Sequence, residues 1–162
     1  MVGRGLKTSI GTVDQLALLW FASPLHGSWP VQLMKTSVVP AVAHQSNLVF
    51  SEGPRLVGYI SWACLTEENE AKYIANPHQL LLRDWVGGDR LWFIDLIAPY
   101  GHLGQMVRHL KTHRFPTQTG RFMRVKKGND TAKVVKVHGA QLSKENQIRH
   151  QPINPYLISK HL

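Results

Sequence analysis

The chain has 162 residues, of which 43% are hydrophobic and 18% charged, ordinary proportions for a globular protein. This composition excludes disorder of the whole chain and predicts one domain over residues 1–162, with a core at about 10–140 and a polar tail at 141–162. The formal net charge of +9 indicates an anionic partner, which could be nucleic acid, an anionic membrane or an acidic protein.

The first apolar segment has a helical pattern. Apolar residues recur at helical spacing over residues 12–21, and Thr12 can cap the start. Pro24 ends this helix because the residue before a proline is pushed out of helical geometry. Pro30 can open a second helix, since proline is tolerated in a first turn. His26, between the two prolines, is therefore expected in a loop that joins two helices.

The rest of the chain alternates between strand and helix patterns. A turn composition at 51–54 joins two strand-like runs, and Thr66 can cap the helix that follows them. The run 91–98 is apolar on both faces, which is typical of a central strand. We expect strands at 47–50, 55–65, 91–98, 121–125 and 133–138, helices at 66–74 and 105–113, and a turn at 126–130. This order predicts an α+β domain with helices packed on a mostly antiparallel sheet.

Two titratable side chains stand out from this pattern. His26 lies in the loop beside Trp29, and Asp95 interrupts the otherwise apolar strand at 91–98. A histidine titrates near neutrality, and a carboxylate can fix the tautomer of an imidazole and stabilise its charged form. If the fold brings the two together, they form a pair suited to general-base chemistry.

Each of the two also has a structural interpretation. His26 can be a loop histidine that simply packs on Trp29. Asp95 would be costly to bury without a partner, and Arg90 or Arg124 could supply a purely structural one. The sequence alone leaves these alternatives open.

Other candidate residues carry weaker signals. Ser23 can terminate the first helix or form a hydrogen bond toward His26. Cys64, the single cysteine, lies in an apolar strand-like run and is interpreted as a buried, unreactive thiol. His109 and His113 are four residues apart on a predicted helix and could pair two metal ligands. Because a metal site normally has three or four ligands, no metal is predicted.

Several segments along the chain form a recognisable ordered set. They are Trp20–Pro30 with its Ser-Pro-Leu-His core, Val57–Ala63, Glu68–Tyr73, Asp84-Trp85, Gly88–Asp95, Ile97–Gly101 and Arg124-Val125. Together they resemble the RTX toxin-activating lysine acyltransferases, the hemolysin-activating proteins of Gram-negative bacteria. The resemblance covers roughly residues 16–139. One such segment would mean little, whereas the ordered set is specific.

The resemblance implies a fold like that of the GNAT acetyltransferases. It also implies transfer of a fatty acyl group from acyl-carrier protein to internal lysines of an RTX protoxin, which activates the toxin. Catalytic roles carry over to His26 and Asp95. Two positions depart from the family pattern, because Gly27 replaces a usually basic residue and Ser37 stands where an asparagine is usual. Ser37, together with Ser23, is therefore a candidate for an oxyanion or positioning contact through its hydroxyl.

The chemistry required of such a site is deprotonation of an amine. A lysine is a nucleophile only when neutral, and its ordinary pKa lies about three units above neutrality. His26 can act as the base, Asp95 can orient the ammonium and relay the proton, or His26 can attack the thioester and form an acyl-imidazole. Direct attack in a ternary complex is favoured, because GNAT-like folds place donor and acceptor together in a splayed sheet.

The implied acyl donor is a thioester on the phosphopantetheine arm of acyl-carrier protein, a co-substrate rather than a bound cofactor. Gly101 and Gly104 could offer backbone N–H groups to its phosphate, although a plain turn explains them equally well. Acyl-carrier proteins are acidic, so a basic docking face would account for the charge excess. The cations assigned to that face, some of which belong to a merely solvated helix surface, are Arg108, Lys111, Arg114 and Arg121.

Two other classes of function compete with an enzyme. The basic segment 121–127 suggests a nucleic-acid-binding module, but it contains one aromatic residue and no complete RNA-binding signature, so no nucleic acid is predicted as partner. An inactive adaptor that docks a carrier protein is the third class. The N-terminal apolar run, which Asp14 interrupts on approach, is interpreted as mature protein, and a cytoplasmic location is expected. A homodimer is an expectation from the family alone.

Overall fold

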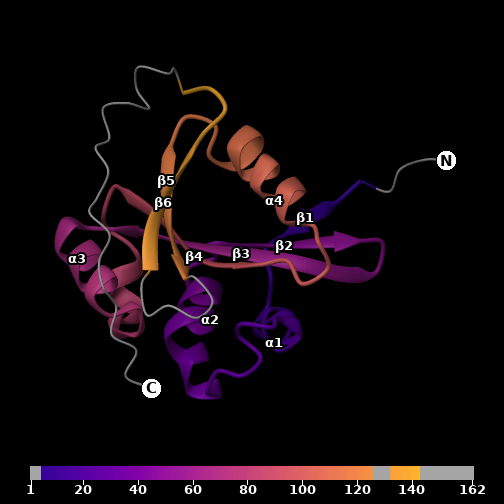
Figure 1. The fold of residues 1–162 in the computed structure, drawn as a ribbon, viewed down its shortest axis with the longest axis horizontal. Helices are drawn as coiled ribbons and strands as arrows, with labels where there is room; N and C mark the ends of the chain where they lie inside the picture. Colours follow the sequence, from indigo (N-terminus) through magenta and orange to yellow (C-terminus); the bar gives the residue numbers. More distant parts are fainter. Residues whose placement is uncertain (1–4, 126–131, 143–162) are drawn as a thin grey trace.

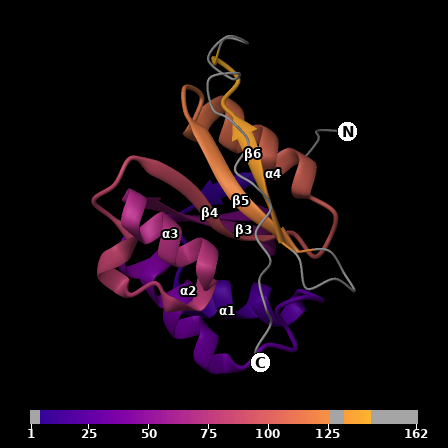
Figure 2. The same ribbon diagram turned by 60° about the vertical axis from the view of Figure 1, so that its left-hand side comes forward.

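The computed structural model describes residues 5–125 and 132–142. Within them, six strands form one sheet, and helices pack against both of its faces (Figures 1 and 2). The strands are β1 (Lys7–Ser9), β2 (Asn47–Glu52), β3 (Arg55–Leu65), β4 (Arg90–Ile97), β5 (Thr119–Val125) and β6 (Ala132–His138). The α-helices are α1 (Val13–Ala22), α2 (Met34–Ala43), α3 (Glu67–Ala75) and α4 (Leu103–His109).

The strands lie in the sheet in the order of the sequence, β1 to β6. All neighbouring pairs are antiparallel except β4 and β5, which run parallel and share the single register pair Trp92↔Arg121. Beyond that pair the two strands separate, so the sheet opens between β4 and β5. The result is an open, mostly antiparallel α+β fold that is consistent with the GNAT-like architecture, as predicted.

The sheet separates two apolar cores. Helices α1, α2 and α3 cover one face, and α4 covers the other (Figure 1). The first core includes Trp20 of α1, Val38 of α2 and Trp92 of β4. The second includes Phe93 of β4 and Met106 of α4. Consecutive residues of β4 therefore pack on opposite faces of the sheet, as the alternation of a strand requires.

Local signals in the sequence explain where several helices begin. The backbone N–H of Thr12 donates to Oε1 of Gln15 (3.1 Å), which is half of a capping box at the start of α1. Thr66 accepts a hydrogen bond from the backbone N–H of Asn69 (3.2 Å) and caps α3. The hairpin of β2 and β3 and the central position of β4 are also confirmed.

Other expectations needed correction. The strand β1 was not predicted, because Lys7–Ser9 is exposed and has no apolar pattern. The second helix begins with a 3-10 turn at Val31–Leu33 before α2, and the helix expected at 105–113 begins at Leu103 and ends in a π-helical turn, Leu110–Arg114. The turn at 126–130 and the tail from residue 143 lie outside the described residues.

Cys64 is half-buried rather than fully buried. Its burial still raises the pKa of the thiol from its ordinary value, although the nearby charge of Arg114 opposes that shift. A raised pKa keeps the thiol protonated at neutral pH, which fits the prediction of an unreactive cysteine. Among the residues that the structure describes, no helix is long and apolar enough to cross a membrane.

Candidate active site

The loop after α1 holds His26 through a series of backbone hydrogen bonds. The N–H of Ser23 donates to the carbonyl of Trp20 (3.1 Å) and ends the helix, and the N–H of Gly27 donates back to the carbonyl of Ser23 (2.8 Å). A Cβ atom at position 27 would lie 2.9 Å from the carbonyl oxygen of Phe21. A glycine therefore allows this tight turn, and any side chain there would require the loop to shift.

A β-bulge in β4 directs Asp95 toward the same place. Ile60 pairs with Leu96 and Trp62 pairs with Phe93, so Ser61 alone stands opposite the two residues Ile94 and Asp95. Such a bulge re-aims side chains in a strand. The hydroxyl of Ser61 accepts the hydrogen bond of the Asp95 backbone N–H (3.2 Å). As a result the Asp95 side chain lies on the sheet face that α1 and α2 cover, where it meets residues of α1 and its following loop.

His26 and Asp95 form a buried pair. The Nε2 atom of His26 lies 3.3 Å from Oδ1 of Asp95, and the two residues are 7% and 6% exposed. On the other side of the imidazole, the hydroxyl of Ser23 lies 2.9 Å from Nδ1. Both predicted catalytic residues are thus brought together, and Ser23 both terminates α1 and contacts His26.

Two further residues hold the Asp95 carboxylate. The hydroxyl of Tyr59 on β3 donates to Oδ2 (2.8 Å), and the indole N–H of Trp20 on α1 donates to the same oxygen (3.2 Å). Burial raises the pKa of the Tyr59 hydroxyl well above its ordinary value, and the charge of Asp95 raises it further. The Tyr59 hydroxyl therefore stays protonated and keeps donating its hydrogen bond to the carboxylate. The sequence does not predict this role, because Tyr59 and Trp20 lie in apolar runs that are typical of a hydrophobic core.

Aromatic rings enclose the imidazole. The ring centroid of His26 lies 4.7 Å from that of Trp29 and 5.2 Å from that of Trp20. Trp29 in turn makes an edge-to-face contact with His78 (5.7 Å). The structural interpretation of His26, packing on Trp29, is thus correct and coexists with the pairing to Asp95.

His78, in a short 3-10 turn at Pro77–Gln79, is the second histidine near this cluster. Its Nδ1 atom is buried and has no hydrogen-bond partner among the described residues. Burial lowers the pKa of His78 from its ordinary value, although the charge of Asp95 opposes this shift. The imidazole of His78 is accordingly neutral at physiological pH.

Arg90 is not the partner of Asp95, contrary to one of the alternatives that the sequence left open. It pairs instead with Glu70 and, at 3.4 Å, with Glu67. The carboxylate of Glu70 is buried, accepts a hydrogen bond from the indole of Trp92 (2.8 Å) and lies 3.8 Å from Nε of Arg121. Glu70 of α3 therefore holds the one register pair that joins β4 to β5.

The structure corrects the role predicted for Arg121. Its guanidinium is largely buried against Glu70 rather than presented on a basic surface. Arg121 is therefore not one of the cations available for docking a partner. Arg124, the other partner suggested for Asp95, is exposed at the end of β5.

Within the residues that the structure describes, the remaining predicted ones form no hydrogen bond or ion pair with the His26–Asp95 pair. Ser37 is buried in α2, and in the described part of the chain its hydroxyl makes no hydrogen bond to His26 or Asp95. Gly101 adopts a positive φ of 86° in the turn before α4, a conformation that favours glycine. Gly104 lies in α4, which covers the opposite face of the sheet from His26.

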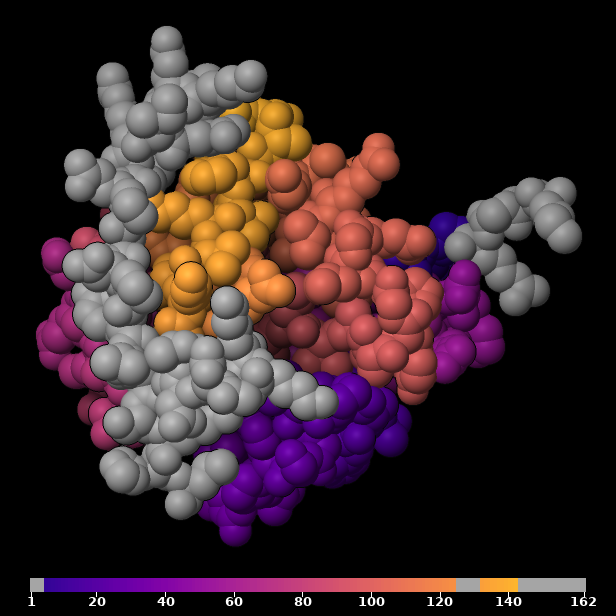
Figure 3. Space-filling model, in the orientation of Figure 1, coloured from indigo at the N-terminus to yellow at the C-terminus, as the bar shows by residue number. Residues whose placement is uncertain are grey.

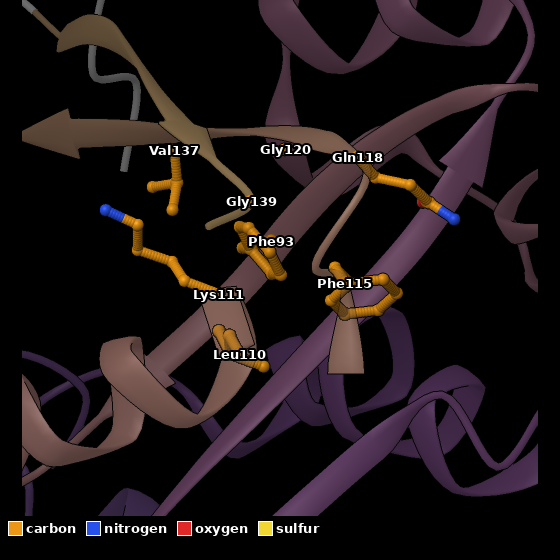
Figure 4. A pocket seen from close by; sticks show the side chains of 8 residues that line it. All are labelled: Phe93, Leu110, Lys111, Phe115, Gln118, Gly120, Val137 and Gly139. Carbon is orange, nitrogen blue, oxygen red and sulfur yellow. The ribbon is translucent and has the colours of Figure 1, made fainter. Parts of the chain in front are cut away.

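Of the predicted docking cations, Lys111 lines a small pocket between the turn after α4 and the strands β4 to β6. Figure 4 shows its lining side chains, with the Phe93 and Phe115 rings at its centre and Lys111 at one side, and the pocket is too small to hold a water molecule. A Cβ atom at position 120 would lie 2.2 Å from the Phe93 ring, so Gly120 leaves the space that this ring fills. Arg108 is exposed on α4.

Arg114 is exposed after α4, but its guanidinium lies 4.8 Å from the ring centres of both Trp62 and Phe115. His109 and His113 stack at 4.9 Å with their rings nearly parallel. Within residues 5–125 and 132–142, no group of three or more histidine, cysteine or acidic side chains is arranged to hold a metal ion.

The fold and the site together define a class. An open, mostly antiparallel sheet of GNAT-like architecture with a buried histidine–aspartate pair has the acid–base groups that an acyltransferase requires. The model of the HlyC family, described as the RTX toxin acyltransferase family, matches residues 8–138. The chain belongs to this family of acyltransferases, which confirms the resemblance found in the ordered segments.

Individual relatives agree with this assignment. The RTX-II toxin-activating lysine-acyltransferase ApxIIC of Actinobacillus pleuropneumoniae is 36% identical over 141 residues, covering 86% of this chain and 88% of the relative. The protein-lysine myristoyltransferase HlyC of Escherichia coli is 39% identical over 133 residues, covering 82% and 78%. The leukotoxin-activating lysine-acyltransferase LtxC of Aggregatibacter actinomycetemcomitans is 39% identical over 131 residues, covering 80% and 77%.

Proposed function

We propose that this protein transfers a fatty acyl group from acyl-carrier protein to the ε-amine of internal lysines in an RTX protoxin. The observation that carries the proposal is the buried His26–Asp95 pair, in a chain of the RTX toxin acyltransferase family. Relatives that are named toxin-activating lysine acyltransferases support lysine as the acceptor and an RTX toxin as the substrate.

The hydrogen bonds around the pair suggest which nitrogen of His26 is the base. Oδ2 of Asp95 accepts from Trp20 and Tyr59, so Oδ1 faces Nε2 of His26. A carboxylate can only accept, and we therefore assign the proton of the neutral imidazole to Nε2. Nδ1 is then the basic atom, and it accepts a hydrogen bond from the hydroxyl of Ser23.

The transfer can then proceed by direct attack. The acceptor lysine loses one proton to solvent, and its neutral nitrogen attacks the carbonyl carbon of the thioester. As the C–N bond forms, the second proton of the amine moves to the Ser23 hydroxyl, whose own proton moves to Nδ1 of His26. The C–S bond then breaks, and the imidazolium returns the proton to the leaving thiolate. Asp95 stabilises the imidazolium between these two steps.

Stabilisation of the oxyanion needs a donor beyond the pair. Ser37 of α2 stays a candidate for that role, because its buried hydroxyl can donate one hydrogen bond. Gly101 and Gly104 remain candidates for contacts to the phosphate of the phosphopantetheine arm.

The carrier protein would dock on the basic side of the molecule. A cleft of about 420 Å³ lies there between α4 and β6, and two lysines, Lys111 and Lys136, are among the residues that line it. Its lining residues are Val107, Lys111, Lys136, Val137, His138, Gly139 and Ala140. An acidic carrier protein is attracted to such a surface. The phosphopantetheine arm would then carry the thioester from this face of the sheet to His26 on the other.

The direct test is to mix the protein with acyl-carrier protein loaded with a fatty acid and a fragment of an RTX protoxin. We expect a mass gain of one acyl group on a lysine of the fragment. No mass gain, combined with salt-sensitive retention of nucleic acid in a gel-shift assay, would overturn the proposal in favour of a nucleic-acid-binding module. No mass gain with intact binding of the carrier protein would indicate an inactive adaptor.

A further inference from the structure

The segment that carries His26 differs in charge from the rest of the chain. Residues 15–34 contain no Asp, Glu, Lys or Arg, although the chain as a whole has 19 basic and 10 acidic residues. This segment includes most of α1, the His26 loop and the 3-10 turn before α2. Surface charges keep a protein soluble, so an uncharged stretch of this length in a strongly basic protein indicates a different role.

Large apolar side chains of this segment are exposed. Leu18 is 61% exposed, Phe21 63%, Leu25 49% and Val31 61%. Leu18 and Phe21 are one turn apart on α1, so they share a face of the helix, and Leu25 follows in the loop. Single exposed apolar residues are normal, but a group of them around one site marks a surface for binding. We call these four residues the apolar surface.

Two residues of the apolar surface, Phe21 and Leu25, lie next to the loop that holds His26. Leu25 is the neighbour of His26 in the chain, and the loop folds back so that Gly27 closely approaches the carbonyl of Phe21. The surface of the segment from α1 to α2 lies at the lower edge of the molecule in Figure 3, whereas α4 lies across the sheet. The apolar surface and the basic side therefore belong to opposite faces of the sheet.

We propose that the apolar surface is the docking site of the acceptor protein, through apolar side chains that flank the target lysine. This inference rests on the proposed acyl transfer. An acceptor lysine must come close to His26, and the exposed side chains that flank the His26 loop are the first groups that the surrounding polypeptide would meet. If the acceptor binds through apolar contacts, the target lysine is the one charged group that has to enter the site past this uncharged segment.

Other occupants fit less well. An acidic carrier protein would be drawn to α4 and β6, because residues 15–34 offer it no cation. A second copy of this chain that docked through the apolar surface would cover the His26 loop and exclude the lysine. A fatty acyl chain is bound most strongly where it is enclosed and removed from water, and the convex outer face of α1 cannot enclose it.

The experiment compares the double variant Leu18→Ser/Phe21→Ser with the wild-type protein and with Val86→Ser. Val86 is a matched control, because it is also an exposed apolar residue (45%) but precedes β4 outside the apolar surface. Binding of a protoxin fragment is measured by calorimetry without acyl donor, and KM is measured for fragment and for donor. Thermal unfolding of each variant confirms that α1 remains folded.

We expect the double variant to bind the fragment about tenfold more weakly, with a matching rise in KM for the fragment. Its KM for the donor and its kcat should stay close to wild type, and Val86→Ser should change none of these values. Unchanged fragment binding by the double variant would overturn the inference. So would a wild-type dimer that this variant dissociates, or a KM change for the donor that grows with acyl chain length.

The failure of this inference is distinguishable from failure of the proposed function. If wild-type protein acylates the fragment but the double variant binds it normally, only the docking surface is wrong. If the wild-type protein acylates nothing, the proposed function is wrong, whatever the binding measurement shows.

Discussion

The hydroxyl of Tyr59 donates a 2.8 Å hydrogen bond to Oδ2 of Asp95, which joins the centre of β3 to the carboxylate of the reacting pair. Tyr59 is completely buried, so water cannot replace this donor when it is removed. A donor of this kind fixes the rotamer of the carboxylate and leaves Oδ1 for His26. The precision of the site thus depends on a residue that never touches the substrate.

Tyr59→Phe tests that dependence. The substitution removes one oxygen atom and leaves the aromatic ring in place. Hydrogen bonds to charged groups contribute about 1.5–3 kcal/mol, so we expect the free energy of unfolding to fall by that amount. Acyl transfer should fall about tenfold, because Asp95 keeps only Trp20 as donor to Oδ2. Urea unfolding and a transfer assay measure the two effects, and an unchanged transfer rate would contradict the positioning role.

Ser23→Ala tests the contact on the other side of the imidazole. The loss of its hydroxyl leaves Nδ1 of His26 without a hydrogen bond from the loop, and removes the proposed proton path. We expect kcat to fall about tenfold or more, within the usual contribution of positioned proton transfer. Ser28→Ala is the control, because the exposed Ser28 hydroxyl donates to the Leu25 carbonyl, at 3.4 Å, and not to the imidazole of His26. Equal rates for the two variants would show that Ser23 serves only to end α1.

Glu70→Gln tests the junction between β4 and β5. The buried carboxylate faces Arg90 and Arg121, and loss of its charge leaves both guanidinium groups less well compensated. Breaking a buried ion pair costs about 3–5 kcal/mol, which is the fall in the free energy of unfolding that we expect. The exposed Glu68, which pairs with Lys72, offers the control Glu68→Gln, and an exposed pair contributes about 0–1 kcal/mol. Similar unfolding curves for both variants would contradict this role of Glu70.

His78 should make the protein less stable in mild acid. Burial lowers the pKa of His78 below its ordinary value of 6.5, so the unfolded chain binds this proton more readily than the folded one. The full free energy of unfolding is therefore available above pH 6.5, and part of it is lost as the pH falls from 6.5 toward the lowered pKa of His78. His78→Phe keeps a ring against Trp29 without a titratable group. Urea unfolding across this range should show a smaller pH dependence for His78→Phe, and an identical dependence would contradict the assignment.

Local chemistry in the sequence predicted much of the fold. Thr12 and Thr66 mark helix starts through capping hydrogen bonds, to the Gln15 side chain and from the Asn69 backbone, and the turn residues at 51–54 mark the hairpin of β2 and β3. These features depend on neighbours within a few residues, so a single sequence contains them. The strand β1 was missed, because it is stabilised by pairing with the distant β2 rather than by its own apolar pattern.

Residue types and the family resemblance predicted the reacting pair. They could not predict how the two side chains are arranged. Asp95 faces His26 because a bulge opposite Ser61 shifts the alternation of β4, and no local pattern announces that bulge. The structural role of Arg121 also depends on a remote contact, with Glu70 of α3. Long-range contacts of this kind set the chemistry of the site and become visible only in the folded chain.

The most direct measurement is lysine acylation of a protoxin fragment by Asp95→Asn, compared with wild type by mass spectrometry under single-turnover conditions. This variant keeps the shape of the side chain but loses the charge that would stabilise protonated His26. We predict a loss of at least about a hundredfold in rate, with thermal unfolding measured in parallel to establish that the variant is folded. A folded Asp95→Asn protein that acylates lysine at the wild-type rate would contradict the His26–Asp95 mechanism.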